Sequence, residues 1–279
     1  MIIDTHLHIW DMENNSYPWL IPEYGPIYRT FQITEAGVHV KAAGVDKAVL
    51  VQAMDSYEDT EYMFSAARRK DFVAGVVGWV PLDRPDEAGK KLEEFTKNPV
   101  FKGMRHLIHE EKDKDWVVRP EVIEGLKVLA SFNLPFDVVA VFPNQLKHVP
   151  TLAAKVPNLR MVIDHMAKPP LDPEQHKVWE EQMRAAAESP NVYGKISGLN
   201  TTTSDFENWT ANDIQPNIDL AFDIFGANRL MFGSDWPVAI LAGTYQKVWD
   251  ETHKAVADRS QAEQDALFGG TAAKFYNIS

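Results

Sequence analysis

The chain has 279 residues and no cysteine, so disulfide frameworks, thiolate metal sites and cysteine nucleophiles are excluded, and only histidine and carboxylate side chains remain as metal ligands. Its 28 Lys and Arg against 40 Asp and Glu give a formal net charge of −12, the wrong sign for a protein dedicated to nucleic acid or to an anionic membrane. The N-terminus, MIIDTHLHIW, lacks the pattern of a secretion signal, and no stretch approaches the ~20 apolar residues that span a bilayer. We therefore expect a cytoplasmic protein that binds neither nucleic acid nor membrane.

Short β-branched runs alternate with longer amphipathic stretches along the whole chain. Strands are predicted to begin near eight positions: Ile2, Asp46, Phe72, Val100, Pro135, Leu159, Val192 and Arg229. Helical patterns, with apolar residues three and four apart, lie between them at 60–70, 86–98, 121–133, 144–156 and 173–189. Asn144 and the pair Asp172-Pro173 have the residue types that start helices.

Eight strand–helix units with a spacing of roughly 32 residues predict an α/β fold, a single (β/α)8 TIM barrel over residues 1–279. The alternative, an open doubly wound sheet, usually carries a glycine-rich phosphate loop after its first strand, and here the first strand continues into HLHIW. Residues 11–33 hold five aromatic side chains and are expected to lie over the barrel mouth. Residues 261–278 predict an added C-terminal helix, a stop at Gly269-Gly270 and a closing apolar segment.

The first strand ends in a His-x-His pair, His6 and His8. Because side chains alternate across a strand, Asp4 should share their face inside the barrel, whereas Ile3 and Leu7 should face the helices. Two imidazoles on one face suit a divalent metal. The plainer alternative is a polar strand end with ordinary histidines.

Two more strand ends carry candidate groups. Asp235 ends the last apolar run, where a carboxylate can bind metal or take a proton from water; the alternative is a turn-capping role before Trp236. Asp164 and His165 follow the sixth strand. As neighbours they point to opposite faces unless the strand has already ended, and His165 alone would suit a hydrogen-bonded core histidine.

Strands four and seven end in basic residues. Arg105 precedes His106, and a guanidinium there can clamp a carboxylate or polarise a carbonyl, unless it pairs with the charged residues 110–113. Lys195 and Ser197 share a face of strand seven. If Lys195 is interior it needs a carboxylate partner, and the available carboxylates are Asp4, Asp137 and Asp164.

The segments IDTHLHIW, YPWL, GMRH, VIDHMAKPP, KISGL and RLMFGSDWPV together resemble the amidohydrolase superfamily. They are most similar to its lactonase-type branch, the amidohydrolase-related proteins, which includes sugar-lactone hydrolases and 2-pyrone-4,6-dicarboxylate lactonase. The resemblance covers essentially the full chain. It implies one divalent metal ion, zinc or manganese, on four residues: His6, His8, His165 and Asp235. Two-metal members carry a lysine or glutamate on strand four and a histidine on strand five, which this chain lacks, and some relatives react without metal.

The resemblance implies a hydrolase that acts on a carboxylic ester bond and opens a small lactone derived from a sugar acid or another carboxylated ring. Asp235 is then the general base and His165 the second catalytic residue, while Arg105, His106 and Trp10 bind the substrate. A nonoxidative decarboxylase of the same superfamily is the alternative, and a non-catalytic binding barrel is a third reading. Strand five reads AVFPNQL where relatives tend to place an arginine. The identity of the lactone and the oligomeric state, a homo-oligomer included, stay open.

Overall fold

The computed structural model describes residues 1–279 and contains one sheet of eight parallel strands in the order β1 to β8. The strands are β1 Ile3–Leu7, β2 Lys47–Val51, β3 Val73–Gly78, β4 Phe101–His106, β5 Phe136–Val138, β6 Met161–Ile163, β7 Val192–Ile196 and β8 Leu230–Phe232. Each begins within two residues of its predicted position. The predicted (β/α)8 barrel is confirmed.

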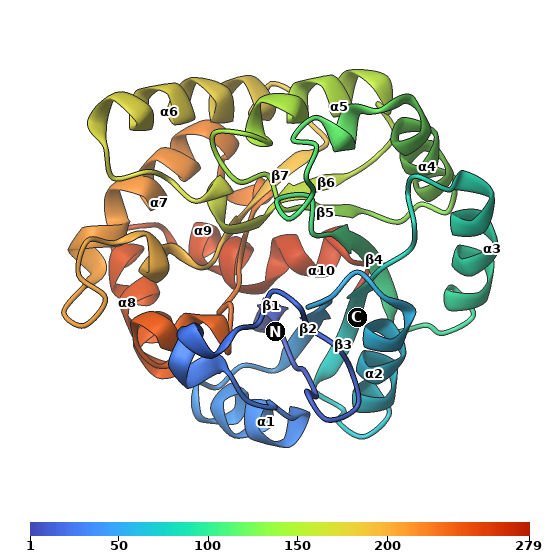
Figure 1. Ribbon diagram of the computed structural model, residues 1–279. Helices are drawn as coiled ribbons and strands as arrows, with labels where there is room; N and C mark the ends of the chain where they lie inside the picture. Colours follow the sequence, from blue (N-terminus) through green and yellow to red (C-terminus); the bar gives the residue numbers. More distant parts are fainter.

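A helix follows each strand, and the helices succeed one another around the sheet (Figure 1). They are α1 Ile33–Ala42, α2 Tyr57–Ala67, α3 Pro85–Phe95, α4 Pro120–Ser131, α5 Val149–Lys155, α6 Pro173–Ala187, α7 Ala211–Phe225 and α8 Tyr245–Ala255. The Asp172 side chain caps α6 by accepting from the backbone N–H of Gln175, as predicted. The start predicted at Asn144 is wrong. A 3₁₀ turn comes first, and α5 begins at Val149, beside a proline that suits a first helical turn.

The barrel closes between β8 and β1 through bonds made beyond the end of β8. The N–H of Asp235 donates to the carbonyl of His6 at 2.8 Å, and the N–H of His8 donates to the carbonyl of Trp236 at 2.7 Å. Leu7 and Trp236 form a parallel bridge at the same place. Closure therefore depends on the segments that carry the predicted site residues.

Strand β1 contains a bulge. Asp4 pairs with Ala48 and Leu7 pairs with Leu50, so two residues of β1 stand opposite one residue of β2 and the inward–outward alternation shifts. The predicted orientation of Asp4 and Ile3 is therefore wrong. Ile3 packs inside the barrel, and the Asp4 carboxylate accepts from the N–H of Ser234 and the hydroxyl of Tyr245.

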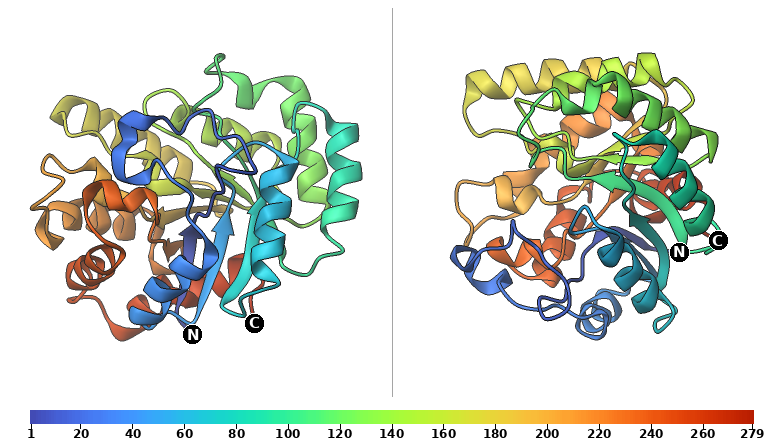
Figure 2. Two further views of the ribbon diagram at one scale, coloured as in Figure 1. Left: turned by 60° about the horizontal axis from the view of Figure 1, so that its bottom comes forward. Right: turned by 45° about the vertical axis from the view of Figure 1, so that its right-hand side comes forward.

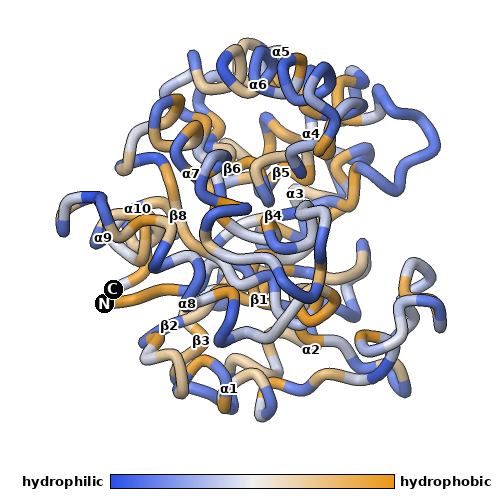
Figure 3. The backbone as a smooth tube through the Cα atoms, turned by 90° about the vertical axis from the view of Figure 1, so that its left-hand side faces the viewer, coloured by the Kyte–Doolittle hydropathy of each residue, from blue (hydrophilic) through white to orange (hydrophobic).

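The inside of the barrel is filled by a small apolar cluster, separate from the large core between strands and helices. It joins residues of five strands with the C-terminal segment: Ile3, Val49, Val51, Val77, Val162, Met231, Ala272, Phe275, Tyr276 and Ile278. In Figure 3 the helices alternate between hydrophobic and hydrophilic residues, as expected when one face of each is buried.

The C-terminal segment is helical beyond the predicted stop. The added helix α9 (Gln261–Asp265) continues through a π turn at Ala266–Gly270 into α10 (Thr271–Phe275). Gly269 does not end the helix; it is glycine because a Cβ there would collide with the carbonyl oxygen of Met1. The N- and C-termini lie at the same end of the barrel (Figure 2, left).

The aromatic loop, residues 11–32, lies at the end of the barrel opposite both termini (Figure 2, left). It is attached to the β2–α2 connection by two side chains. The Trp19 indole N–H donates to the carbonyl of Ala53 at 2.6 Å, and the Tyr17 hydroxyl donates to Asp59 at 2.8 Å. The loop covers the barrel mouth as predicted. None of the helices has the length and apolar character needed to traverse a membrane.

Candidate active site

His6, in β1, and His8, directly after it, point into the barrel mouth. Their Nε2 atoms lie 3.1 Å apart. The Nδ1 atom of His8 is 2.7 Å from the carbonyl oxygen of Val51, and because a carbonyl only accepts, Nδ1 carries the proton and Nε2 presents its lone pair to the site. Burial lowers the pKa of His6 well below its usual value, so its ring is neutral.

Asp235 lies directly beyond β8, in the left-handed backbone conformation with φ 57°. Its Oδ1 atom is 3.6 Å from Nε2 of His8, 3.8 Å from Nε2 of His6 and 3.9 Å from Nε2 of His165. Burial opposes ionisation of this carboxyl, but the three neighbouring imidazoles more than compensate and hold the pKa of Asp235 below its usual value. The site therefore contains an ionised carboxylate facing three imidazoles.

His165 reaches the site through an unusual turn. Strand β6 ends at Ile163, and residues 165–168 all have positive φ although none is glycine. This left-handed turn lets Asp164 and His165 both join the interior, whereas a continuing strand would have separated them. The His165 Nδ1 lies 2.9 Å from the Ser197 hydroxyl, and burial lowers the pKa of His165 to about 4.

The donor atoms fit a single divalent ion. The Nε2 atoms of His6 and His8 and the Oδ1 of Asp235 form a triangle with sides of 3.1, 3.6 and 3.8 Å. Such a triangle has a point about 2.0 Å from all three corners, which is the length of Zn–N and Zn–O bonds. Nitrogen and oxygen donors also suit manganese and related ions. His6, Asp164 and His165 form a second cluster of possible ligands that shares His6.

A buried charged network supports His6 from below. The Lys195 ammonium lies 3.1 Å from Nδ1 of His6, 2.5 Å from Asp137 and 3.2 Å from Asp164. The hydroxyl of Tyr276, next to α10, donates to Asp137 at 2.8 Å. Lys195 thus has two of the three carboxylate partners considered from the sequence, Asp137 and Asp164. Asp4 is not one of them, because the bulge turns it outward.

Arg105, near the end of β4, lies against His6 and His8. Its Nη1 atom is 3.0 Å from Nε2 of His6 and 3.4 Å from Nε2 of His8, and its Nε atom is 3.4 Å from Asp164. The guanidinium is buried, so the predicted alternative of a surface pair with residues 110–113 does not hold.

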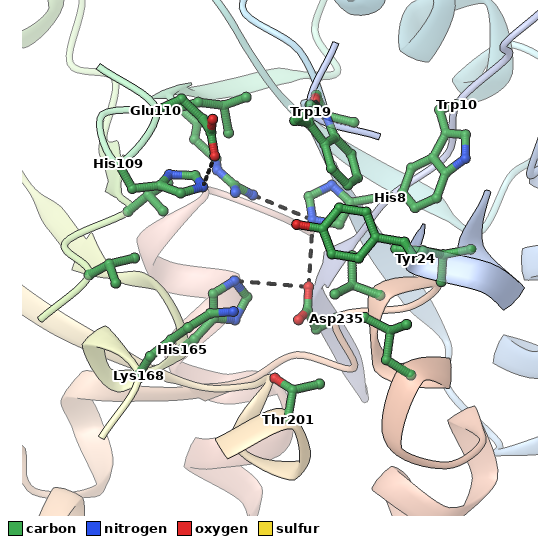
Figure 4. A pocket seen from close by; sticks show the side chains of 18 residues that line it. His8, Trp10, Trp19, Tyr24, His109, Glu110, His165, Lys168, Thr201 and Asp235 are labelled. Atoms are coloured by element: carbon green, nitrogen blue, oxygen red, sulfur yellow. Dashed lines mark hydrogen bonds and ion pairs between the residues drawn. The ribbon is translucent and has the colours of Figure 1, made fainter. Parts of the chain in front are cut away.

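A pocket of about 270 Å³ opens above these groups, and Figure 4 shows the side chains around it. Its lining includes His8, Trp10, Trp19, Tyr24, Ile27, Ala53, Arg105, Leu107, His109, Glu110, Val139, Val141, His165, Lys168, Thr201, Asp235, Val238 and Leu241. A pocket of this size suits one small ring.

The structure brings most of the predicted site residues together: Trp10, Arg105, His8, His165 and Asp235 line the pocket, and His6 lies directly behind them. His106 does not join them. The Trp79 indole N–H donates to its Nδ1 at 3.0 Å, Glu111 lies 2.9 Å from its Nε2, and Trp116 stacks on its ring. Being next to Arg105 on a strand, His106 takes the opposite face.

Sequence reasoning missed His109 and Lys168 as pocket residues. His109 follows Arg105 by four positions in a non-helical turn, where no periodicity indicates direction. Burial and the nearby Arg105 lower the pKa of His109 to about 3, and its Nδ1 has no hydrogen-bond partner. Lys168 enters the pocket because the left-handed turn places it there. In the sequence, the only indication of Lys168 was its position in VIDHMAKPP, one of the segments that carry the family resemblance.

The chain is similar to known proteins over nearly its whole length. A family model described as Amidohydrolase matches residues 3–278. An L-fucono-1,5-lactonase from Burkholderia ambifaria is 34% identical, with 99% of this chain and 95% of that protein covered. A protein of the same name from Burkholderia multivorans is 32% identical, with 99% and 96% covered.

Solved structures agree with these likenesses. The chain is similar to a crystal structure of an amidohydrolase from Burkholderia multivorans with bound zinc, with a TM-score of 0.90, 31% identity and 100% of both chains covered. Structures of 5-carboxyvanillate decarboxylases are only 12 to 15% identical. Their likeness shows the fold alone.

Proposed function

This chain belongs to the amidohydrolase family, and on that premise we propose that it is a lactonase that opens a small lactone of a sugar acid by attack of water. The observation that carries the proposal is the ionised Asp235 carboxylate at the floor of a ring-sized pocket, 3.6 to 3.9 Å from three imidazoles. The likeness to two fuconolactonases over nearly the whole chain supports the same reaction.

Asp235 is the general base in this proposal. Its carboxylate takes a proton from water as the water oxygen attacks the lactone carbonyl carbon. When the bond between that carbon and the ring oxygen breaks, Asp235 returns the proton to the ring oxygen, and the product is a hydroxy acid. The left-handed backbone of Asp235, tied to the carbonyl of His6, holds the carboxylate in place for both transfers.

His6, His8 and Asp235, with His165 beside them, would hold one divalent ion, zinc or manganese. When bound, the ion supplies Lewis-acid polarisation of the carbonyl. Within the chain itself, the guanidinium of Arg105 and the ring of His165 lie where they can donate to an oxyanion. Val51 and Ser197 fix the ring orientation of His8 and His165 by hydrogen bonds to their Nδ1 atoms.

The pocket walls suit a hydroxylated ring. Trp10 and Trp19 provide apolar surface on one side, and Lys168 and Thr201 provide polar groups on another (Figure 4). We assign Arg105 to the substrate carbonyl or carboxylate. His106 has a positioning role in this proposal, because both of its ring nitrogens already have protein partners.

The test is acid release from a lactone panel, with L-fucono-1,5-lactone, D-glucono-1,5-lactone and unsubstituted δ-valerolactone, using heat-denatured protein to subtract spontaneous hydrolysis. We expect catalysed opening of a sugar lactone, loss of rate on chelation and recovery with zinc or manganese. Failure to hydrolyse any member of a broad lactone panel would overturn the proposal. Release of CO₂ from an aromatic acid under the same conditions would favour the decarboxylase alternative.

A further inference from the structure

The Arg105 guanidinium contacts the same two nitrogen atoms, Nε2 of His6 and Nε2 of His8, that would bind the metal ion. Its Nη1 lies 3.0 Å from Nε2 of His6 and 3.4 Å from Nε2 of His8. A guanidinium has only N–H donors and stays protonated in proteins. For His8 the Nε2 lone pair must accept this hydrogen bond, because its Nδ1–H is bonded to the carbonyl of Val51. The Nε2 of His6 lies within reach of the same Nη1.

A nitrogen lone pair cannot accept a hydrogen bond from Arg105 and bind a cation at the same time. The point about 2.0 Å from His6, His8 and Asp235 needs the lone pairs of the two Nε2 atoms that Arg105 contacts. Two cations would also stand next to each other there, with a large repulsion in a buried site. We propose that Arg105 is an internal competitor of the metal ion, so that guanidinium and ion occupy the two imidazoles alternately. The inference rests on the metal-binding part of the proposed function.

Arg105 has a second position available without leaving its anchor. Its Nε atom lies 3.4 Å from Asp164, which Lys195 also contacts. Its side chain already lines the pocket next to Leu107 and His109. Rotation about the outer bonds would carry the Nη atoms from the imidazoles into the pocket, toward the oxygen atoms of a substrate. Binding of the ion thus releases the substrate-orienting group, and removal of the ion leaves a cation on the imidazoles.

The test measures metal affinity in the absence of substrate. Metal-stripped protein is titrated with Zn²⁺ against a chromophoric chelator for the wild type, Arg105→Met and Arg105→Lys. We expect Arg105→Met to bind Zn²⁺ about 10- to 100-fold more tightly than the wild type, the scale on which groups around metal ligands act. The Zn²⁺ affinity of Arg105→Lys should lie between those of the wild type and Arg105→Met. A lysine ammonium keeps the positive charge, but it cannot contact both imidazoles and Asp164 at once as the planar guanidinium does.

Lys168→Met is the matched control, since it removes another pocket cation, one that makes no hydrogen bond to His6 or His8. Its Zn²⁺ affinity should stay within about threefold of the wild type. Unchanged or weaker binding by Arg105→Met, or an equal gain for Lys168→Met, overturns the inference. If Arg105→Met does not fold, as judged by thermal unfolding, the comparison of Arg105→Lys with the wild type decides. Lactonase activity does not enter these measurements, so a failed activity test and a failed affinity test are distinguishable.

Discussion

The backbone N–H of Asp235 donates a 2.8 Å hydrogen bond to the backbone carbonyl of His6. This bond joins the last strand end to the first and helps to close the barrel. It also places the Asp235 carboxylate 3.8 Å from the His6 ring. The same contact therefore closes the barrel and positions two site residues, although these residues are 229 positions apart in the chain.

Replacement of Asp235 by Asn should abolish most lactonase activity and keep the fold. The amide cannot take a proton from water, and loss of a general base lowers rates by about 10²- to 10⁴-fold. The measurement is kcat/KM on the best lactone together with the thermal unfolding midpoint. Asp205→Asn, a change at an exposed carboxylate, is the control and should retain full activity. A fully active Asp235→Asn variant would exclude the general-base role.

Gly198 tests how closely the site is packed. Its φ is +61°, and an added Cβ would lie 2.8 Å from Nδ1 of His165 and 2.9 Å from Oδ2 of Asp235. Gly44, at the end of α1, has a similar φ, +71°, with no atom within 4 Å of such a Cβ. We expect Gly198→Ala and Gly44→Ala each to lose about 1–2 kcal/mol of stability from backbone strain. Only Gly198→Ala should also lose activity, and equal activity in the two variants would contradict the packing argument.

Lys195 neutralises two buried carboxylates. With Lys195→Met, Asp137 and Asp164 would lose the cation that lies between them, and removal of one partner from a buried ion pair costs about 3–5 kcal/mol. The additional change Asp137→Asn should recover part of this loss, because it removes one of the two charges. Urea unfolding of the single and double variants measures the difference. A double variant less stable than Lys195→Met would show that Asp137 does not depend on Lys195.

His109 should make stability depend on pH. Burial lowers its pKa to about 3, whereas an unfolded histidine has a pKa near 6.5. Between these values the unfolded chain binds the extra proton, so this residue lowers the stability of the native protein as the pH falls below about 6.5. The variant His109→Gln lacks this penalty. Relative to the wild type, its free energy of unfolding should rise by about 2 kcal/mol from pH 7 to pH 5, measured by urea unfolding. A difference independent of pH would contradict the neutral state of this partly buried ring.

The alternation of strands and helices was readable from the sequence because the period of apolar residues changes between the two kinds of element. The same alternation placed Lys195 and Ser197 on one face of strand seven, and in the structure both contact histidines of the site. Regular alternation failed in two places. A bulge in β1 turned Asp4 outward and Ile3 inward, and a left-handed turn after β6 brought Asp164 and His165 to the same side.

The His106 and His109 positions show the same limit. Both lie in the segment GMRHLIH, yet His106 faces away from the pocket and His109 enters it. Strand geometry ends at His106, and beyond it the direction of a side chain depends on the loop. Local sequence carries no periodic signal for such a loop.

The residues themselves determined the class of chemistry. A chain without cysteine leaves nitrogen and oxygen ligands, and eight strand–helix units bring strand ends to a common rim. The tertiary structure alone decided which side chains meet there: Arg105 on the imidazoles, Lys195 beneath His6, and Asp235 held by the carbonyl of His6. These contacts join strands far apart in sequence, so no local pattern encodes them; they follow from closure of the barrel, the β1 bulge and the turn after β6.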